Sequence, residues 1–285
     1  MNPAEVVRRA ADYLAAHGVE SPRENAEILL RDVLKTDRAG LYARRDGLNT
    51  AEARAFGRAL CQRCNGTPLQ YLTGTQPFMD LVLSVEPGVF VPRPETEVLV
   101  EVGLETLEGV ATPVVVDVGT GTGAVALAIK HRRPDARVLA TDVSGAAAIL
   151  AKANASTLGL EIEVLGGALL GPIPVELRGC LDLLVSNPPY VTAQEYEALP
   201  QEVKREPYPA LVGGTELHSE LVELAGEWLR PGGWLVVEIG ASQAPEVTSM
   251  FERRLLGVDV LTDLAGRDRV VRGRLDEGRE DRGPK

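Results

Sequence analysis

The spacing of apolar residues divides the chain into segments of different character. Up to residue 73, apolar residues recur every three or four positions, and this period predicts helices that each bury one face. The segments with this pattern are 3–18, 21–35 and 50–64. We expect Ser21 and Thr50 to cap the second and third of these helices. Residues 1–73 are therefore predicted to form a small helical domain.

The pattern then changes from a helical period to an alternating one. Leu81, Leu83 and Val85 alternate with residues of different polarity, and Pro87 and Gly88 follow as a turn signal. Residues 74–91 are therefore predicted to form a β-hairpin linker.

From residue 113 onward, short apolar runs alternate with helical patterns. The runs predicted to be strands are 114–119, 136–144, 162–167, 181–186, 233–240, 257–262 and 269–274. Strands that alternate with helices indicate an α/β fold with a mainly parallel sheet covered on both faces. We assign residues 92–276 to this domain. The tail, 277–285, is charged and poor in apolar residues, so we expect it to be disordered.

Composition is that of a soluble globular protein of about two domains. The chain has 285 residues, of which 45% are hydrophobic and 25% charged. No apolar run approaches the roughly 18 residues that span a membrane, and the N-terminus has no signal-peptide core. We expect a cytoplasmic protein with no membrane association. Three cysteines and three histidines stand at no metal-ligand spacing, so we expect neither a metal site nor a disulfide framework.

The net charge of −11 bears on the partner. Proteins that bind nucleic acid usually carry a basic surface, because neutralising phosphates supplies most of the affinity. The acidic balance makes nucleic acid an unlikely direct substrate, although it leaves room for a local basic patch. An acidic face suits a basic protein partner.

Two features of the predicted sheet favour a nucleoside ligand. The first strand leads into "DVGTGTGAVALA", in which Gly119, Gly121 and Gly123 allow tight turns and a close approach of the backbone to a ligand. Asp142 ends the second strand, where a carboxylate can accept both hydroxyls of a ribose. A glycine-rich turn by itself is weak evidence, because it can be turn chemistry alone. Neither a P-loop nor a Gly-x-Ser-x-Gly elbow is present.

The tetrapeptide Asn187-Pro188-Pro189-Tyr190 ends the buried run "LLVS". Each proline lacks an N–H and has a fixed φ, so the strand must stop and the chain becomes stiff where an amide and an aromatic ring emerge. The alternative is a turn that only terminates the strand.

With the glycine loop and Asp142, this tetrapeptide resembles the class I S-adenosylmethionine-dependent methyltransferases that alkylate planar nitrogens. The resemblance implies a Rossmann-like, seven-stranded methyltransferase sheet. It also implies S-adenosyl-L-methionine as cofactor and S-adenosyl-L-homocysteine as product. The implied cofactor-binding residues are Asp117, Gly119, Thr120, Gly121, Thr122, Gly123, Asp142, Leu169 and Asn187.

Further segments, spread from about residue 5 to 275, resemble the release factor glutamine methyltransferases. They are "PLQYLTG", "GVFVPRPETEVLVE", "REPYPALVGG", "EIGASQ" and "GRDRVVRGR", together with the two motifs above. The resemblance implies methylation of the glutamine in the Gly-Gly-Gln motif of peptide chain release factors, with residues 1–73 docking the substrate. We expect a monomer. The implied substrate-binding residues are Arg93, Glu95, Thr96, Asn187, Pro188, Pro189 and Tyr190; residues 93–97 can alternatively serve only to begin a helix at 94–108.

The chemistry explains why these residue types suit the reaction. An amide nitrogen is a poor nucleophile, so positioning must supply much of the rate. The Asn187 side-chain carbonyl can accept one amide N–H, and the Pro188 backbone carbonyl can accept the other. Tyr190 can pack over the planar amide. Asn187, Pro188 and Tyr190 are therefore the predicted catalytic residues.

One stretch departs from the family pattern. After the third strand the family commonly carries an acidic and then an aromatic residue beside the adenine, whereas Ala168 and Leu169 stand here. We expect apolar contact from Leu169 to replace the ring and cofactor affinity to be weaker. Two alternatives stay open. The same tetrapeptide is found in methyltransferases of exocyclic amino groups of adenine or guanine in nucleic acid, and the altered stretch would also suit a binding module that has lost turnover.

Overall fold

The computed structural model describes residues 2–278, which form two compact units. The first unit holds the residues up to Thr75 together with Pro200–Arg205, and the second holds Gln76–Leu199 and the residues from Glu206 onward. The sequence places residues 200–205 in the domain 92–276, so their grouping with the helical unit is new. The predicted disordered tail, 277–285, lies outside the described residues except for its first two positions.

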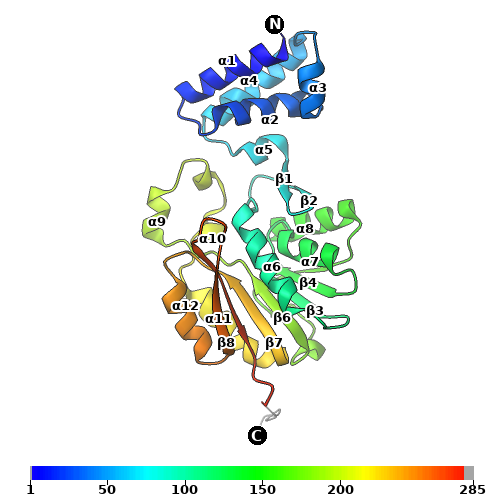
Figure 1. Cartoon of the computed structure of the whole chain (residues 1–285), viewed down its shortest axis with the longest axis vertical. Helices are drawn as coiled ribbons and strands as arrows, with labels where there is room; N and C mark the ends of the chain where they lie inside the picture. Colours follow the sequence, from blue (N-terminus) through cyan, green and yellow to red (C-terminus); the bar gives the residue numbers. More distant parts are fainter. Residues whose placement is uncertain (1, 279–285) are drawn as a thin grey trace. The chain divides into compact units, whose positions relative to one another are not determined.

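The first unit is helical. Its helices are α1 (Pro3–Ala16), α2 (Pro22–Leu34), α3 (Arg38–Ala43), α4 (Thr50–Cys64) and α5 (Leu69–Thr73) (Figure 1). The apolar faces of the longer helices meet in one core, whose fully buried members include Leu14, Leu29, Leu30 and Leu41. The short helices α3 and α5 were not predicted, because segments of five or six residues show too little of a helical period.

The caps of the two predicted helices differ from expectation. Asn49, not Thr50, caps α4: its side chain accepts the N–H groups of the first turn, and Glu52 completes a capping box. Ser21 precedes α2 but has a φ of 45° and makes no capping hydrogen bond through its side chain. The predicted cap at Thr50 was therefore wrong, whereas Ser21 stands at the predicted N-cap position of α2 without the capping hydrogen bond.

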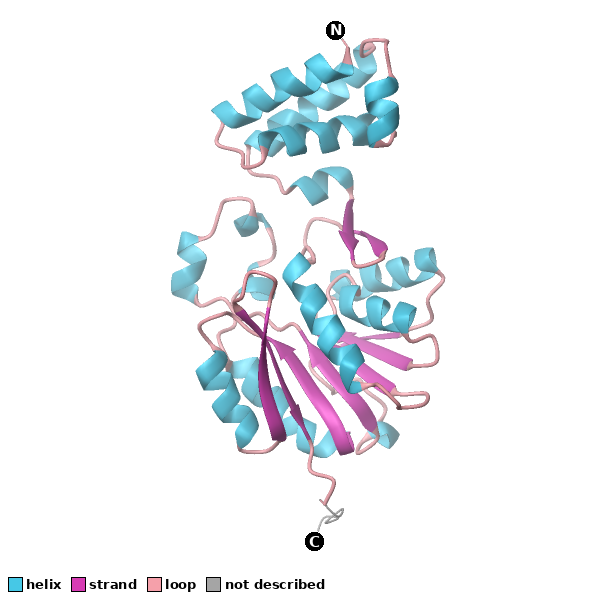
Figure 2. Ribbon diagram, viewed as in Figure 1, coloured by secondary structure: helices cyan, strands magenta, loops and turns pink. Residues whose placement is uncertain are grey.

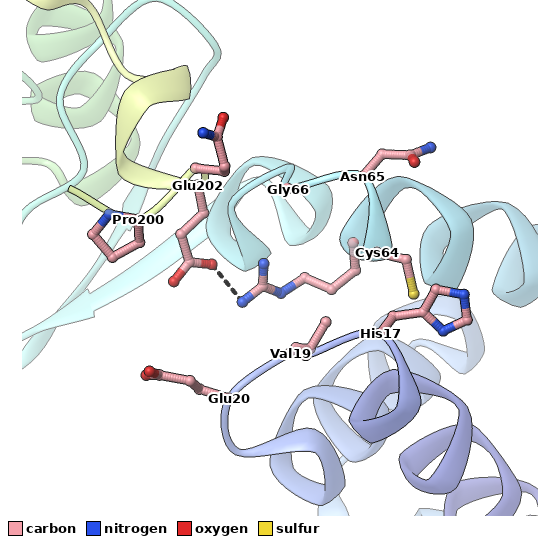
Figure 3. Close-up of a pocket in the computed structure, with 11 residues that line it drawn as sticks. His17, Val19, Glu20, Cys64, Asn65, Gly66, Pro200 and Glu202 are labelled. Atoms are coloured by element: carbon pink, nitrogen blue, oxygen red, sulfur yellow. Dashed lines mark ion pairs between the residues drawn. The ribbon is translucent and has the colours of Figure 1, made fainter. Parts of the chain in front are cut away.

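Arg63 ties residues 200–205 into the helical unit. Its guanidinium is buried, with Nη2 lying 2.5 Å from Glu202 Oε2, and its Nε donates to Asn25 Oδ1 at 2.7 Å. Figure 3 shows this ion pair in a cleft that is also lined by Glu20 and Pro200. A buried arginine needs such partners because an unpaired charge would be costly away from water.

The second unit is built on a seven-stranded sheet, which confirms the predicted α/β fold. The strand order is β5-β4-β3-β6-β7-β9-β8, and β9 runs antiparallel to both of its neighbours while the other paired strands are parallel. Figure 2 shows these strands in magenta. Their bounds are β3 (Val114–Val118), β4 (Arg137–Asp142), β5 (Glu163–Gly166), β6 (Leu181–Ser186), β7 (Leu229–Glu238), β8 (Leu256–Thr262) and β9 (Asp268–Arg274).

Helices cover both faces of this sheet. Alternate strand residues point to opposite faces, so Val115 belongs to the core on one face and Val116 to the core on the other. The first core includes side chains of α6 (Glu97–Thr106), α7 (Ala124–Arg132) and α8 (Gly145–Leu158), and the second includes those of α11 (Glu216–Trp228) and α12 (Ala244–Glu252). The short helices α9 (Ala193–Ala198) and α10 (Tyr208–Leu211) lie between β6 and α11 in the chain. No helix among residues 2–278 is long and apolar enough to cross a membrane.

The hairpin is fixed to the second unit by a buried asparagine. Strands β1 (Thr75–Phe78) and β2 (Leu81–Ser84) form a separate two-stranded sheet. Asn154 of α8 accepts the Ser84 N–H at 2.8 Å and donates to Ser84 O at 3.0 Å and to Thr122 O at 2.9 Å. One side chain therefore connects the hairpin, α8 and the glycine-rich loop.

Replacing this side chain should lower stability. Asn154→Ala would leave three backbone groups without partners, which should reduce the free energy of unfolding by roughly 2–3 kcal/mol. Denaturant titration measures this loss. Ser156→Ala, an exposed change on the same helix, should stay within about 0.5 kcal/mol of the parent protein. An Asn154→Ala protein as stable as Ser156→Ala would contradict the role.

Candidate active site

The carboxyl ends of four parallel strands meet at one edge of the sheet, where most of the predicted site residues lie. Val118 at the end of β3 pairs with Thr141 of β4 and with Ser186 of β6. Ser186 pairs in turn with Val237 of β7, so the four strands end close to level. Strands β4 and β5 lie on one side of β3, and β6 and β7 lie on the other, so the order of the strands reverses at β3. Ligands of open α/β sheets bind at such a reversal of strand order.

The glycine-rich loop after β3 leaves open space at two of its three glycines. Gly119, Gly121 and Gly123 have φ values of 73°, 58° and 85°, a conformation that favours glycine. A Cβ added at Gly119 or Gly121 would meet no atom within 4 Å, whereas one at Gly123 would lie 3.0 Å from Leu127 Cδ1. The first two glycines can therefore border a ligand, and Gly123 is required for packing on α7.

Asp117 connects this loop to the start of α7 through hydrogen bonds. Its Oδ2 accepts the Thr120 hydroxyl at 2.6 Å and the Ala126 N–H at 3.2 Å, which joins the loop to the start of α7. The side chain is almost fully buried, and burial raises the pKa of Asp117 to about 7. These contacts give Asp117 a structural role in holding the loop. Its predicted contact with a cofactor stays a prediction.

Asp142 joins the same loop to the next helix. Its Oδ2 accepts the Gly121 N–H and its Oδ1 accepts the Ser144 N–H, each at 2.8 Å. Ser144 in turn caps α8 through its hydroxyl. A carboxylate offers about four acceptor positions, so this half-buried side chain retains capacity for the two hydroxyls of a ribose.

The loop after β5 lies beside Asp142. The Gly167 N–H donates to Asp142 O at 2.9 Å. Two residues later, Leu169 is half-buried with a φ of 51° and packs against the core on one face of the sheet, whereas Ala168 is exposed. The predicted contact of Leu169 with the adenine stays a prediction.

Asn187 follows directly after β6, a strand whose six residues are all buried. Its Nδ2 donates to Thr96 Oγ1 at 3.1 Å. Because the nitrogen end of the amide is directed at Thr96, the oxygen end is left as an acceptor. Thr96 was predicted to bind substrate, and the structure brings it into contact with the predicted catalytic amide across 91 residues of sequence.

Tyr190 is held at both its hydroxyl and its backbone. Its hydroxyl donates to Glu238 Oε1 at 3.1 Å, and its carbonyl accepts Gln243 Nε2 at 2.9 Å. Burial raises the pKa of Tyr190 above its ordinary value, so the phenol stays protonated. A Cβ added at Gly213 would lie 2.4 Å from Pro189 O, so this glycine allows the following loop to pack on the tetrapeptide.

Arg93 and Glu95 are arranged differently from Thr96. The Arg93 guanidinium pairs with buried Glu206, which also accepts the Val91 N–H at 2.9 Å, and it lies 5.1 Å from the centre of the Phe90 ring. Arg93 thus joins the segment before α6 to the loop after β6. Glu95 is exposed in a 3-10 turn, η1 (Pro94–Thr96). Substrate contact by either residue stays a prediction.

The sequence marks Glu238 as either a structural or a pocket-lining residue, and the structure shows it in contact with Tyr190. Sequence reasoning missed Gln243 and Gly213, which also contact the tetrapeptide, and Glu206, which pairs with Arg93. All four residues stand in segments quoted for the family resemblance, "EIGASQ" (238–243) and "REPYPALVGG" (205–214), and this was the available signal. Among residues 2–278, no group of histidine, cysteine or acidic side chains has an arrangement that could hold a metal ion.

The chain is similar over nearly its whole length to proteins of one family. The PrmC N-terminal domain model matches residues 5–74, and the Methyltransferase small domain model matches residues 81–262. A release factor glutamine methyltransferase of Moorella thermoacetica is 45% identical over 276 residues, covering 93% of this chain and 94% of the relative. One of Geobacter sulfurreducens is 41% identical over 270 residues, covering 92% and 93%.

A solved methyltransferase shares the fold. The 16S rRNA methyltransferase of T. thermophilus, in complex with AdoMet and guanosine, matches with a TM-score of 0.54 and 22% identity, covering 70% of this chain and 49% of that one. At this identity the likeness concerns the fold alone.

The buried carboxyl of Asp117 should make stability depend on pH. Its folded pKa of about 7 lies above the unfolded value of about 3.9, so its contribution to stability is lost as the pH rises from about 4 to 7. The Asp117→Asn side chain cannot ionise, so the variant should not show this loss of stability. The difference in Tm between Asp117→Asn and the parent protein should therefore increase in favour of the variant from pH 5 to pH 8. A difference that stays constant over this range would show that Asp117 is already ionised at pH 5.

Proposed function

The chain belongs to the release factor glutamine methyltransferase family, and from this premise we propose its reaction. It transfers a methyl group from S-adenosyl-L-methionine to the side-chain amide nitrogen of the glutamine in the Gly-Gly-Gln motif of peptide chain release factors. The products are N5-methylglutamine and S-adenosyl-L-homocysteine. The observation that carries the proposal is the Asn187 amide, whose nitrogen is engaged by Thr96 and whose oxygen is left to accept.

The residues at the sheet edge fit this cofactor. Gly119 and Gly121 leave space for a ligand beside the backbone, and Asp142 retains acceptor positions for the ribose hydroxyls. Leu169, in the loop after β5, supplies apolar surface for the adenine. When bound, the cofactor supplies an electrophilic methyl group on a sulfonium. We propose that Thr120 and Thr122 also line this part of the site.

The remaining chemistry belongs to the tetrapeptide. Asn187 Oδ1 accepts one N–H of the substrate amide and the Pro188 carbonyl accepts the other, so the nitrogen is held toward the methyl group. Both acceptors also favour the partial positive charge that develops on this nitrogen during transfer. Tyr190, fixed by Glu238 and Gln243, packs against the amide plane. The proton leaves the nitrogen after methyl transfer, so no strong base is required.

Charge supports a protein substrate over nucleic acid. The helical unit, residues 1–75 with 200–205, has 13 Lys or Arg against 10 Asp or Glu, whereas the rest of the chain has 17 against 31. The candidate site lies in the second, acidic unit. The negative charge of this unit would repel the phosphates of a polynucleotide. We therefore do not favour the alternative of a base methyltransferase, and we assign substrate docking to the helical unit. Because release factors act in translation termination, the proposal implies a cytoplasmic enzyme.

Transfer of labelled methyl groups tests the reaction and the substrate together. The protein is incubated with methyl-labelled S-adenosylmethionine and a purified release factor, or with a release factor whose Gly-Gly-Gln glutamine is replaced by alanine. The proposal expects label in the first release factor and none in the second. Label in both, or label in added RNA or DNA but not in protein, would overturn it.

Asn187→Ala should separate chemistry from cofactor binding. Loss of one positioned acceptor in the transition state should lower kcat by roughly 10²-fold or more. Binding of S-adenosylmethionine, followed by calorimetry, should be largely retained. A variant that methylates at near the parent rate would show that the amide oxygen is not used.

Asp142→Ala should instead weaken cofactor binding. The carboxylate would make charge-assisted hydrogen bonds to the ribose, so its loss should raise the Kd for S-adenosylmethionine roughly 10-fold or more. Glu161→Ala, which removes an exposed carboxylate, serves as the matched control and should leave the Kd unchanged. Equal Kd values for the two variants would remove the ribose assignment.

A further inference from the structure

A buried carboxyl contacts the tetrapeptide that carries the predicted catalytic amide. Glu238 is the last residue of β7 and is 1% exposed. Its Oε1 accepts the Tyr190 hydroxyl at 3.1 Å, while its Oε2 is buried with no hydrogen-bond partner within normal distance among residues 2–278. His218 Nε2 lies 2.9 Å from the Glu238 backbone carbonyl, which fixes the end of the strand. Burying a carboxyl costs free energy, so its presence at the site requires a reason.

Thr96 connects this carboxyl to Asn187. The Thr96 oxygen accepts the Asn187 Nδ2–H at 3.1 Å, so its own proton is free to be donated elsewhere. The Thr96 hydroxyl lies near enough to the Glu238 carboxyl to lower its pKa, as the Tyr190 hydroxyl does, and Glu238 Oε2 is the buried oxygen that is left to accept this proton. Two hydroxyls from different segments therefore converge on one carboxyl.

The direction of these hydrogen bonds decides which end of the Asn187 amide is presented. An ionised carboxylate only accepts, so it makes both hydroxyls donate toward it. The Thr96 oxygen then has only lone pairs left to offer, and it must receive the nitrogen end of the amide. If the Thr96 hydroxyl were instead to donate to Asn187, the amide would turn over and present its NH₂ group. An NH₂ group is a hydrogen-bond donor, so in that orientation Asn187 could not accept the N–H of the substrate amide.

We propose that Glu238 is a positioning residue that, through the Thr96 hydroxyl, fixes the Asn187 amide with its oxygen facing the substrate and, through the Tyr190 hydroxyl, fixes the aromatic ring beside it. This inference rests on the proposed function, because it assigns Asn187 Oδ1 to the substrate amide. It adds a residue that does not touch the substrate and that acts through two others.

The ionisation of Glu238 should then control activity near neutral pH. Burial raises its pKa to about 7, while Thr96, Arg269 of β9 and Tyr190 lower it and Glu95 raises it further. Arg269 is itself paired with Asp263, and burial lowers the pKa of His218, so that group is neutral here. Below pH 7 the Glu238 carboxyl is protonated and can donate to the Thr96 oxygen. The Thr96 hydroxyl is then no longer forced to donate to Glu238, and the orientation of the Asn187 amide is no longer fixed. Transfer should therefore decline as the pH falls below about 7.

Glu238→Gln tests the proposal with little change in shape. Its amide can donate as well as accept, so kcat for methyl transfer to a release factor should fall roughly 10- to 100-fold, while the Kd for S-adenosylmethionine stays within about threefold. The step in kcat near pH 7 should disappear. Glu252→Gln, an exposed change on α12, should behave like the parent protein. A parent-like kcat and pH profile in Glu238→Gln would overturn the proposal.

The path through Thr96 is tested by coupling. Thr96→Val removes the hydroxyl and should lower kcat as Glu238→Gln does, whereas Thr96→Ser keeps the hydroxyl and should be roughly 10-fold more active than Thr96→Val. The double variant of Glu238→Gln and Thr96→Val should be no slower than the slower single variant, because both break one chain of hydrogen bonds. Losses that multiply in the double variant would contradict a shared path.

A measurement without turnover separates this inference from the proposed function. In ¹⁵N-labelled protein, the Asn187 side-chain NH₂ resonance, assigned by its loss in Asn187→Ala, should shift with a midpoint near pH 7 and should not shift in Glu238→Gln. A resonance that is insensitive to pH in the parent protein would refute the inference even if release factor is methylated. The predicted shift without any methylation of release factor would instead refute the proposed substrate and leave the positioning role intact.

Discussion

The site depends on how the buried strand β6 ends. Two successive prolines stop the strand where it would otherwise continue its pairing, so the Asn187 amide emerges on a stiff backbone at the edge of the sheet. The hydrogen bond from its nitrogen to Thr96 restrains the rotation of the side chain. A weak nucleophile such as an amide gains reactivity mainly from being held in place, so this fixed acceptor is the feature around which the other contacts are organised.

The parallel register explains why residues from distant parts of the chain gather there. Strands β3, β4, β6 and β7 end close to level, and the glycine loop, Asp142, Asn187 and Glu238 each stand at or just after a strand end. Asp142 and Asn154 then fix the glycine loop to α8 and to the hairpin. The cofactor side and the substrate side of the site are thus built on one rigid frame, and the buried carboxyls of Asp117 and Glu238 lie within that frame.

Local patterns predicted the parts of the site that are local in sequence. A stretch of a few residues is enough to identify the glycine loop, Asp142 at a strand end, or the tetrapeptide. The alternation of strands and helices indicated the sheet that brings them together. The contacts of Thr96 with Asn187, Tyr190 with Glu238 and Arg93 with Glu206 join residues that are 91, 48 and 113 positions apart. No periodicity carries such information. The same holds for residues 200–205, which contact the helical unit through the ion pair of Glu202 with Arg63 and the hydrogen bond from Arg205 to Asn65 O.

The most direct test of this account is a structure of the protein with S-adenosylhomocysteine and a release factor, or a peptide that contains its Gly-Gly-Gln motif. The distance to measure joins the side-chain nitrogen of the substrate glutamine to Asn187 Oδ1. The account predicts a hydrogen bond of about 2.9 Å, with the Asn187 nitrogen still on Thr96. A glutamine amide bound elsewhere, or an Asn187 amide turned with its nitrogen toward the substrate, would contradict it.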